Sequence, residues 1–207
     1  MLCIGAHSDD LEIGCAGTLL TWLKSPRPIH VTWVVLSAHG EREREARRSA
    51  KALLRGAQRI DLIFGAFRDG FLPAQYEQVK QFFEDVKLRG PVDIVFTHRL
   101  EDRHQDHRTA AELTWNTWRD HLVLEYEIPK YEGDLGLPNV YVPLPTNIER
   151  KKEAHLERHF GTQRSKGWFS RETFAALARL RGIECRSPSG YAEAFHGRKV
   201  TLSAELS

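Results

Sequence analysis

Four short apolar runs alternate with helical segments in the first half of the chain, and this alternation constrains the fold more than any other feature. The apolar runs are rich in aliphatic residues and cover residues 2–5, 29–37, 59–64 and 92–97. Each run precedes a segment with helical periodicity, at residues 11–23, 41–54, 75–88 and 108–118. Strands that alternate with helices indicate βαβ units and a parallel sheet. Apolar runs without period-two alternation indicate strands that are buried on both faces.

The second half of the chain is less regular. Strands are predicted at residues 121–128, 139–144 and 191–200. Helices are predicted at 147–160 and 171–180, the first capped by Asn147 and the second by Ser170. No repeat, low-complexity segment or linker divides the 207 residues. The sequence therefore predicts a single α/β domain over residues 1–207, with a mostly parallel sheet.

Charge and cysteine content argue against a nucleic-acid-binding, membrane-surface or disulfide-stabilised protein. A formal net charge of +2 and a hydrophobic fraction of 41% are ordinary for a soluble protein and give no case for a nucleic-acid or membrane-surface partner. No segment has the pattern of a secretion signal or a membrane span, and three cysteines do not make a disulfide framework, so a cytoplasmic location is expected. The charged run 41–48 alternates in sign and predicts a solvated helix start. Five tryptophans leave a homo-oligomer open.

Two polar clusters stand where a predicted strand ends and a helix begins. The first cluster contains His7, Asp9 and Asp10, and the second contains His98, Asp102, His104, Asp106 and His107. Carboxyl ends of parallel strands share one edge of a sheet, where α/β folds bind ligands, so the clusters are expected to converge. Isolated histidines are more often surface or satisfied core groups, and that ordinary role is assigned to His30, His39, His121, His155 and His159.

Histidine and carboxylate side chains in this arrangement predict a catalytic zinc site, because such sites use three protein ligands and keep a fourth position open. His7 and Asp10 are three residues apart, as are His104 and His107. If His107 is the third ligand, His104 lies close to the metal without having to bind it. Asp9 is suited to take a proton from a metal-activated water, and His104 to stabilise an oxyanion or protonate a leaving amine. The expected enzyme is a hydrolase of an amide or ester.

These motifs together resemble the LmbE-like, or PIG-L, family of zinc-dependent de-N-acetylases. The first family motif, Ala-His-Pro-Asp-Asp, appears as Ala-His-Ser-Asp-Asp at residues 6–10, before a glycine-containing helix start at 14–18. The second, His-Pro-Asp-His, appears as His-Gln-Asp-His at residues 104–107. The turn Arg-Asp-Gly at 68–70 and the segment Tyr-Ala-Glu-Ala-Phe at 191–195 also match family segments at the right separations. The resemblance covers nearly the whole chain.

The resemblance implies a Rossmann-like three-layer fold and one Zn²⁺ per chain, with His7, Asp10 and His107 as ligands. It implies that Asp9 is the general base and that His104 is the oxyanion stabiliser or general acid. It also implies that the partner is a small amino-sugar compound, usually an N-acetylglucosaminyl one, and not nucleic acid or a membrane. Some family members instead cleave thiol-sugar conjugates or act in antibiotic pathways. The sugar is therefore free, nucleotide-linked or part of a natural product.

The candidate substrate-binding residues are Asp69, Arg68 and Arg103. Asp69 matches a family residue that hydrogen-bonds sugar hydroxyls, with a turn aspartate as the alternative, and Arg68 precedes it. Arg103 has no family match. Its guanidinium suits an anionic group such as a sugar-nucleotide phosphate, but an ion pair with Glu101 or Asp106 is the preferred interpretation.

Departures from the family pattern remove no functional atom. Ser8 stands where proline is usual, and Ala16 where glycine is common. The alternative function is a sugar- or nucleotide-binding Rossmann-like protein without hydrolase activity, supported only by Gly14 and Gly17 at a helix start. A cysteine hydrolase has less support, because Cys15 falls on an apolar helix face, where the pKa of a thiol is raised.

Overall fold

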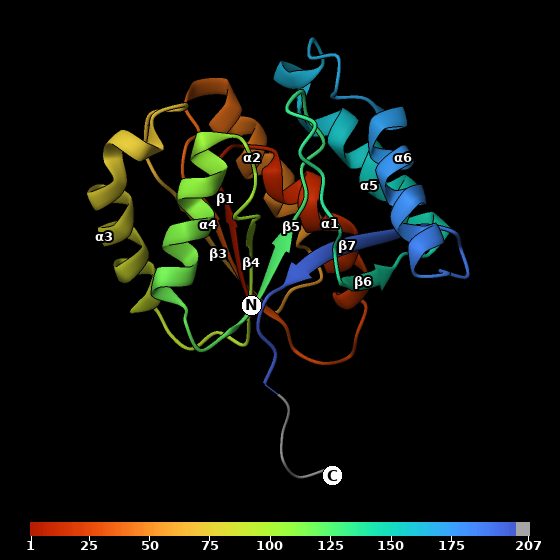
Figure 1. The fold of residues 1–207 in the computed structure, drawn as a ribbon, viewed down its shortest axis with the longest axis horizontal. Helices are drawn as coiled ribbons and strands as arrows, with labels where there is room; N and C mark the ends of the chain where they lie inside the picture. Colours follow the sequence, from red (N-terminus) through yellow and green to blue (C-terminus); the bar gives the residue numbers. More distant parts are fainter. Residues whose placement is uncertain (202–207) are drawn as a thin grey trace.

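The computed structural model describes residues 1–201 and contains a seven-stranded sheet between two layers of helices (Figure 1). Five strands pair in parallel in the order β3-β2-β1-β4-β5. They are β1 (Leu2–Gly5), β2 (His30–Val35), β3 (Arg59–Phe64), β4 (Ile94–His98) and β5 (Leu122–Tyr126). Beyond β5, the strands β7 (Ala192–Gly197) and β6 (Val140–Pro143) are added antiparallel. The prediction of a three-layer α/β fold with a mostly parallel sheet is confirmed.

Helices cover both faces of the sheet, as buried parallel strands require. One face packs against α1 (Asp10–Trp22), α2 (Gly40–Leu53), α5 (Thr146–His159) and α6 (Arg171–Glu184). The other packs against α3 (Tyr76–Lys87) and α4 (Gln105–Thr117). The short 3₁₀ helices η1 (Leu72–Gln75) and η2 (Gly161–Gln163) lie in loops. Within β1, Cys3 joins the first core, while Leu2 and Ile4 join the second, because successive strand residues face opposite ways.

Some predicted boundaries differ from the structure. The helix predicted to be capped by Asn147 begins at Thr146, with Pro145 as its N-cap residue, so Asn147 lies in the first turn. A proline is tolerated there because the first backbone amides of a helix have no carbonyl partner within it. The predicted strand 191–200 ends at Gly197, and residues 202–207 of the predicted domain lie outside the described residues. Among residues 1–201, no helix is long and apolar enough to cross a bilayer.

Candidate metal centre

The two polar clusters of the sequence meet at one edge of the sheet. β1 and β4 are neighbouring parallel strands, so the loops that follow them leave the sheet on the same side. The first loop ends where α1 begins at Asp10, and the second ends where His104 caps α4. Along the chain, the strand order reverses between β1 and β4, and open α/β sheets bind ligands at this kind of switch point.

Three side chains at this edge have donor atoms with the spacing of a tetrahedral metal site. His7 Nδ1 lies 3.2 Å from His107 Nε2 and 3.5 Å from Asp10 Oδ2, and His107 Nε2 lies 3.6 Å from Asp10 Oδ1. Zinc bonds of roughly 2.0–2.1 Å place the donors of a tetrahedral site about 3.3 Å apart. All three side chains are buried. The two Asp10 distances involve different carboxylate oxygens. Groups of three with all ligand atoms within 4.8 Å of one another join His7 and His107 with His104, and Asp10 and His107 with His98, so the residues at this edge have the chemistry and proximity of a metal site.

Asp102 orients the ring of His107. Its Oδ2 atom lies 3.0 Å from His107 Nδ1, and Lys130 Nζ lies 3.0 Å from the same oxygen. A proton held on Nδ1 leaves the lone pair on Nε2 free for the candidate metal position. Burial, and then the neighbouring His98, lower the pKa of His107 to about 3. The ring is therefore neutral near pH 7, as a metal ligand must be.

In His7 the two ring nitrogens exchange roles: Nε2 contacts carboxylates, and Nδ1 faces the candidate metal position. Its Nε2 atom lies 3.1 Å from Asp69 Oδ1 and 3.1 Å from Asp106 Oδ2. Burial opposes ionisation, but Asp10, Asp106 and Asp69 together raise the pKa of His7 well above its usual value of 6.5. A metal at Nδ1 displaces a proton from that nitrogen, while Nε2 keeps its proton for the carboxylates. Metal binding and protonation of His7 therefore compete.

Asp9 lies beside the three candidate ligands but contacts different groups. The Ser8 hydroxyl donates to Asp9 Oδ1 at 3.4 Å, and Arg42 Nη2 lies 4.0 Å from that oxygen. Burial and the adjacent Asp10 raise the pKa of Asp9 to about 6, against the opposing charge of Arg42. A carboxylate that titrates close to neutral pH has the property that a general base needs.

Two further histidines contact the cluster. The ring of His104 is half-buried, with its centroid 4.9 Å from that of His7 and 4.5 Å from that of His107. His98, at the end of β4, stacks on His107 with 3.9 Å between centroids, and its Nε2 lies 3.0 Å from Asp10 Oδ2. His98 is fully buried and does not line the cavity in front of the cluster. Its Nε2 accepts the Ala6 amide at 2.9 Å and its ring packs against His107 from behind, a role that the sequence pattern did not assign.

The predicted substrate residues of the third-strand turn separate in the structure. Asp69 lines the cavity, where it pairs with Arg42 and lies near His7. The guanidinium of Arg68 lies over the ring of Phe71, 3.6 Å from its centroid. Arg68 is not among the residues that line the cavity in the described part of the chain. The geometry brings Asp69, but not Arg68, to the candidate metal centre.

Arg103 is exposed, and neither expected ion pair forms within residues 1–201. Glu101 pairs with Arg198 and Asp106 contacts His7, while the Arg103 amide donates to Asp134 Oδ2 at 2.6 Å. The preferred ion-pair interpretation of Arg103 is therefore wrong. The backbone of Arg103, and not its guanidinium, anchors this loop.

Arg42 is a functional candidate that the sequence pattern missed. The charged run 41–48 was expected to be solvated, and Arg44, Arg47 and Arg48 do form exposed ion pairs with Glu41 and Glu43. Arg42 instead is 26% exposed, pairs with Asp69 and donates from Nε to Ser8 Oγ at 3.3 Å. Glu45, three residues later, is buried as well. This three-residue spacing is the signal that marks an inner face within the run.

An open cavity of about 280 Å³ lies in front of the candidate metal centre. Two loops form its wall, residues 127–139 between β5 and β6 and residues 160–170 between α5 and α6, and both extend beyond the arrowhead of β5 (Figure 1). The Tyr131 hydroxyl accepts a hydrogen bond from the Gly167 amide at 3.2 Å and joins the loops. No motif marks the wall residues, which are Ile128, Lys130, Tyr131, Glu132, Lys166 and Trp168.

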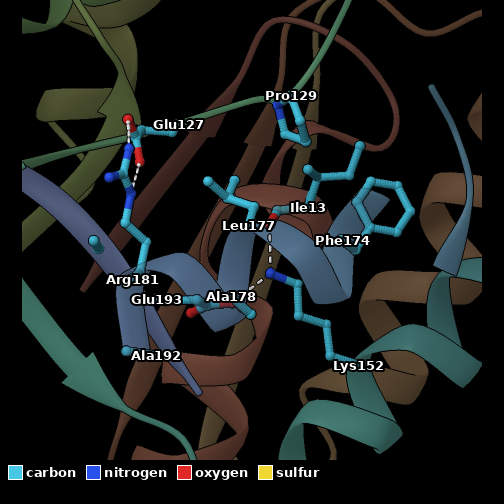
Figure 2. Close-up of a pocket in the computed structure, with 12 residues that line it drawn as sticks. Ile13, Glu127, Pro129, Lys152, Phe174, Leu177, Ala178, Arg181, Ala192 and Glu193 are labelled. Atoms are coloured by element: carbon cyan, nitrogen blue, oxygen red, sulfur yellow. Dashed lines mark hydrogen bonds and ion pairs between the residues drawn. The ribbon is translucent and has the colours of Figure 1, made fainter. Parts of the chain in front are cut away.

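A second, much smaller cavity lies between α1, α5, α6 and β7 (Figure 2). Its volume of about 20 Å³ is large enough for one water molecule and too small for a substrate. Lys152 donates to the Ile13 carbonyl and to Glu193, and Glu193 accepts from the Gly17 amide at 2.8 Å. Ile13 and Gly17 are four residues apart, so the two side chains contact the same turn of α1. The buried pair therefore ties α5 and β7 to the middle of α1.

The glycines and the cysteine that suggested a nucleotide-binding protein or a cysteine hydrolase have structural roles in α1. A Cβ atom on Gly14 would lie 2.3 Å from the ring of Tyr126, and one on Gly17 would lie 2.6 Å from Leu144. These glycines therefore allow α1 to approach its neighbours and need no nucleotide to explain them. The Cys15 thiol donates to the Leu11 carbonyl, and burial raises its pKa well above 9.0, which is unfavourable for a nucleophile.

Comparisons with known proteins place the chain among deacetylases and similar folds. Residues 2–118 match the family described as PIG-L, GlcNAc-PI de-N-acetylase. The uncharacterized deacetylase YaiS of Escherichia coli K12 is 28% identical over 172 residues, which are 77% of this chain and 89% of that protein. N,N'-diacetylchitobiose deacetylase from Pyrococcus horikoshii has a TM-score of 0.69 at 21% identity, over 94% of this chain and 82% of that one. The 4-carboxy-2-hydroxymuconate hydratase GalB of Pseudomonas putida has a TM-score of 0.76 at 19% identity, over 100% of this chain and 98% of that one.

Proposed function

The chain belongs to the PIG-L family, and on that premise we propose that residues 1–207 form one zinc-dependent deacetylase domain that removes an N-acetyl group from an amino-sugar compound. The convergence of His7, Asp10 and His107 is the observation that carries the proposal, because the two ring nitrogens lie 3.2 Å apart and each has an Asp10 carboxylate oxygen within 3.6 Å. Such a set holds one zinc ion per chain and leaves its fourth position to water or substrate. Three free cysteines suit a reducing compartment, so a cytoplasmic location is part of the proposal.

The proposed reaction divides the work among neighbouring side chains. These three residues would hold the zinc ion, which when bound would supply a lowered water pKa and polarisation of an amide carbonyl. Asp9 takes the proton from the attacking water, because it lies beside Asp10 and holds a proton weakly near neutral pH. Asp102 and Asp106 keep the rings of His107 and His7 in the tautomers that present Nε2 and Nδ1 to the metal.

His104 fits the role of oxyanion stabiliser better than that of general acid. Its Nδ1 accepts the Asp106 amide at 3.2 Å, so a neutral ring carries its proton on Nε2. Burial, and then His7, lower the pKa of His104 below its usual value. A neutral ring at pH 7 donates a hydrogen bond to a developing oxyanion but has no extra proton for a leaving amine.

The cavity walls suit a sugar. Tyr131 and Trp168 offer ring faces, and Asp69 offers carboxylate oxygens that accept hydrogen bonds from hydroxyls. Lys166 has no carboxylate partner within residues 1–201 and is the wall cation that remains for an anionic group on the substrate. The family description names a GlcNAc compound and a similar structure is a diacetylchitobiose deacetylase, so we propose an N-acetylglucosaminyl group as substrate.

Metal analysis combined with an acetate-release assay tests the proposal. The protein is expected to carry one zinc per chain and to release acetate from N-acetylglucosamine, diacetylchitobiose or a nucleotide-linked N-acetylglucosamine. The double variant His7→Ala with Asp10→Ala should lose both zinc and activity. His30→Ala, which changes an exposed histidine bonded to Gln58, is the matched control and should lose neither. Full zinc content in the double variant would contradict the ligand assignment.

The hydratase GalB shares the fold, and a fold alone does not choose the reaction. The charge of the cavity argues against a substrate with several carboxylates. Four acidic residues line it, against the three cations Arg42, Lys130 and Lys166. Arg42 is paired with Asp69, and Lys130 with Asp102 and Asp134, so Lys166 alone is left for a carboxylate among the described lining residues. Apart from the proposed zinc, the described lining therefore offers one free cation, which suits an acetamido sugar with at most one anionic group.

A further inference from the structure

A separate groove lies at the far ends of α1 and α2. Both helices begin at the candidate metal centre, and α1 has 13 residues, so its end is about 20 Å away at roughly 1.5 Å per residue. The groove has a volume of about 610 Å³, within the range of small-molecule sites. Residues that follow α1 and α2 form two sides, and α5 forms the third. None of its lining residues belongs to the metal centre.

Cations dominate the lining of this groove. Lys24 follows α1, Arg55 follows α2, and Lys151 and Arg158 belong to α5. None of these four forms an ion pair or a side-chain hydrogen bond within residues 1–201, and no acidic residue of this part of the chain lines the groove. Elsewhere on α2, the neighbouring cations Arg44, Arg47 and Arg48 are all paired with glutamates. The groove therefore keeps an unneutralised positive charge.

Two histidines of the groove have lowered pKa values, first because they are buried and second because cations lie near them. Burial, and then His159, Lys151 and Arg158, lower the pKa of His155 to about 4. Burial, and then Arg158 and Arg48, lower the pKa of His159. The His155 ring is also held by the Ser49 hydroxyl at 2.7 Å, so its position is fixed. A further cation is disfavoured in this groove, and an anion is favoured.

Helix dipoles account for only part of this arrangement. Lys24 and Arg55 follow the ends of helices and Arg158 lies in the last turn of α5, where cations are stabilised without any ligand. Lys151 lies in the second turn of α5, near the opposite end, where the dipole gives a cation no such benefit. The helix dipole therefore does not account for the place of Lys151 beside the other three cations.

We propose that this groove binds a small multivalent phosphate anion, either free or as a phosphate ester. Lysine and arginine are the side chains that bind phosphate, and arginine does so through a planar fork. Leu20, Leu23 and Leu53 give the groove an apolar floor that can contact an organic part of the ligand. The site is independent of the proposed deacetylase reaction.

Isothermal titration with inorganic pyrophosphate and, separately, with ADP tests this site. Both probes are expected to bind the wild-type protein, and the double variant Lys151→Glu with Arg158→Glu should bind at least tenfold more weakly. Arg89→Glu makes the same kind of change at an exposed, unpaired cation outside the groove and should bind within twofold of wild type. Circular dichroism and thermal unfolding confirm that each variant is folded.

The two probes distinguish the sources of phosphate. Tighter binding of ADP supports an ester whose organic part contacts the leucine floor, and equal binding supports a free phosphate anion. Failure of both probes to bind the wild type would overturn the proposal. Unchanged affinity in the Lys151 and Arg158 double variant would overturn it too, because the probes would then bind elsewhere, including at the metal centre.

Discussion

Asp102 and His107 are joined by a contact of 3.0 Å between Oδ2 and Nδ1, and both side chains are buried. Lys130 Nζ lies near the same carboxylate oxygen, and the ring of His98 stacks on a face of the His107 imidazole. The ring of His107 is therefore held in place and in one tautomer by groups that do not touch the candidate metal position. Loss of such a supporting group typically weakens metal binding by about 10–100-fold.

Asp102→Asn is expected to weaken zinc binding by about 10–100-fold, because an amide is a poorer partner for the Nδ1 proton than a carboxylate. Competition with a chromophoric chelator measures the affinity. Asp61→Asn changes a surface aspartate paired with Arg59 and serves as the control, with no loss expected. Equal zinc affinity in the two variants would mean that Asp102 does not orient the ligand.

Asp9→Asn is expected to keep its zinc and lose roughly 10²–10⁴-fold in turnover, because the amide cannot take a proton from water. The substitution preserves the shape of the side chain and its contact with the Ser8 hydroxyl. Metal content and the rate of acetate release are measured on the same sample. Turnover near the wild-type value would remove Asp9 as the general base, whereas loss of zinc would make it a ligand.

Zinc binding is expected to release a proton near neutral pH and to weaken as the pH falls. The pKa of His7 is raised well above 6.5, so Nδ1 is protonated in the metal-free protein at pH 7 and must lose that proton to the metal. While His7 stays protonated, the apparent affinity falls by up to about tenfold for each unit of pH lost. Calorimetry in two buffers of different ionisation enthalpy counts the protons. A count of zero at pH 7 contradicts the raised pKa.

Gly14→Ala is expected to destabilise the fold by about 1–3 kcal/mol, as is usual for overpacking a filled interior. The added methyl group would meet the Tyr126 ring at 2.3 Å, and α1 would have to move away from β5. Gly161→Ala is the control, because its nearest neighbour would be Glu45 Oε1 at an ordinary 3.4 Å. Urea denaturation gives both values, and equal stability of the two variants would refute the packing account.

Lys152→Met is expected to cost about 3–5 kcal/mol of unfolding free energy, because it leaves the buried Glu193 carboxylate without its cation. The neighbouring Lys151→Met removes an exposed, unpaired cation and should change stability by no more than about 0.5 kcal/mol. The same urea experiment compares them. A small loss in Lys152→Met would show that the Gly17 and Thr18 amides alone compensate for the charge of Glu193.

The parallel part of the sheet was predictable because its strands are continuous apolar runs with a helix after each. The position of His7 and Asp10 followed, since a loop after a parallel strand has only one edge on which to lie. The antiparallel end of the sheet was not predictable in the same way. Strand β6 pairs with β7 some fifty residues later, and its partly exposed residues carry no periodic signal that names a partner.

The charged residues of the site were harder to predict than its histidines. Arg42 and Lys130 are of types that usually face solvent, and only the folded chain shows that Arg42 meets Asp69 and that Lys130 is buried against Asp102. Arg103 shows the converse, since its expected acidic partners are occupied by groups distant in sequence. Long-range pairing of charges depends on tertiary structure, which a local pattern does not contain.

The hydrogen bond between Tyr131 and Gly167 joins two loops that both lie outside residues 2–118, the part of the chain matched by the family. The candidate ligands and Asp9 all lie inside that part. The matched part supplies the candidate ligands and Asp9 together with Arg42 and Asp69, which also line the cavity, whereas the two loops supply the rest of its wall. Because the Tyr131–Gly167 bond joins the two loops, they would have to be exchanged together, with Lys130 retained for its contact with Asp102, to reshape the cavity wall around unchanged candidate ligands.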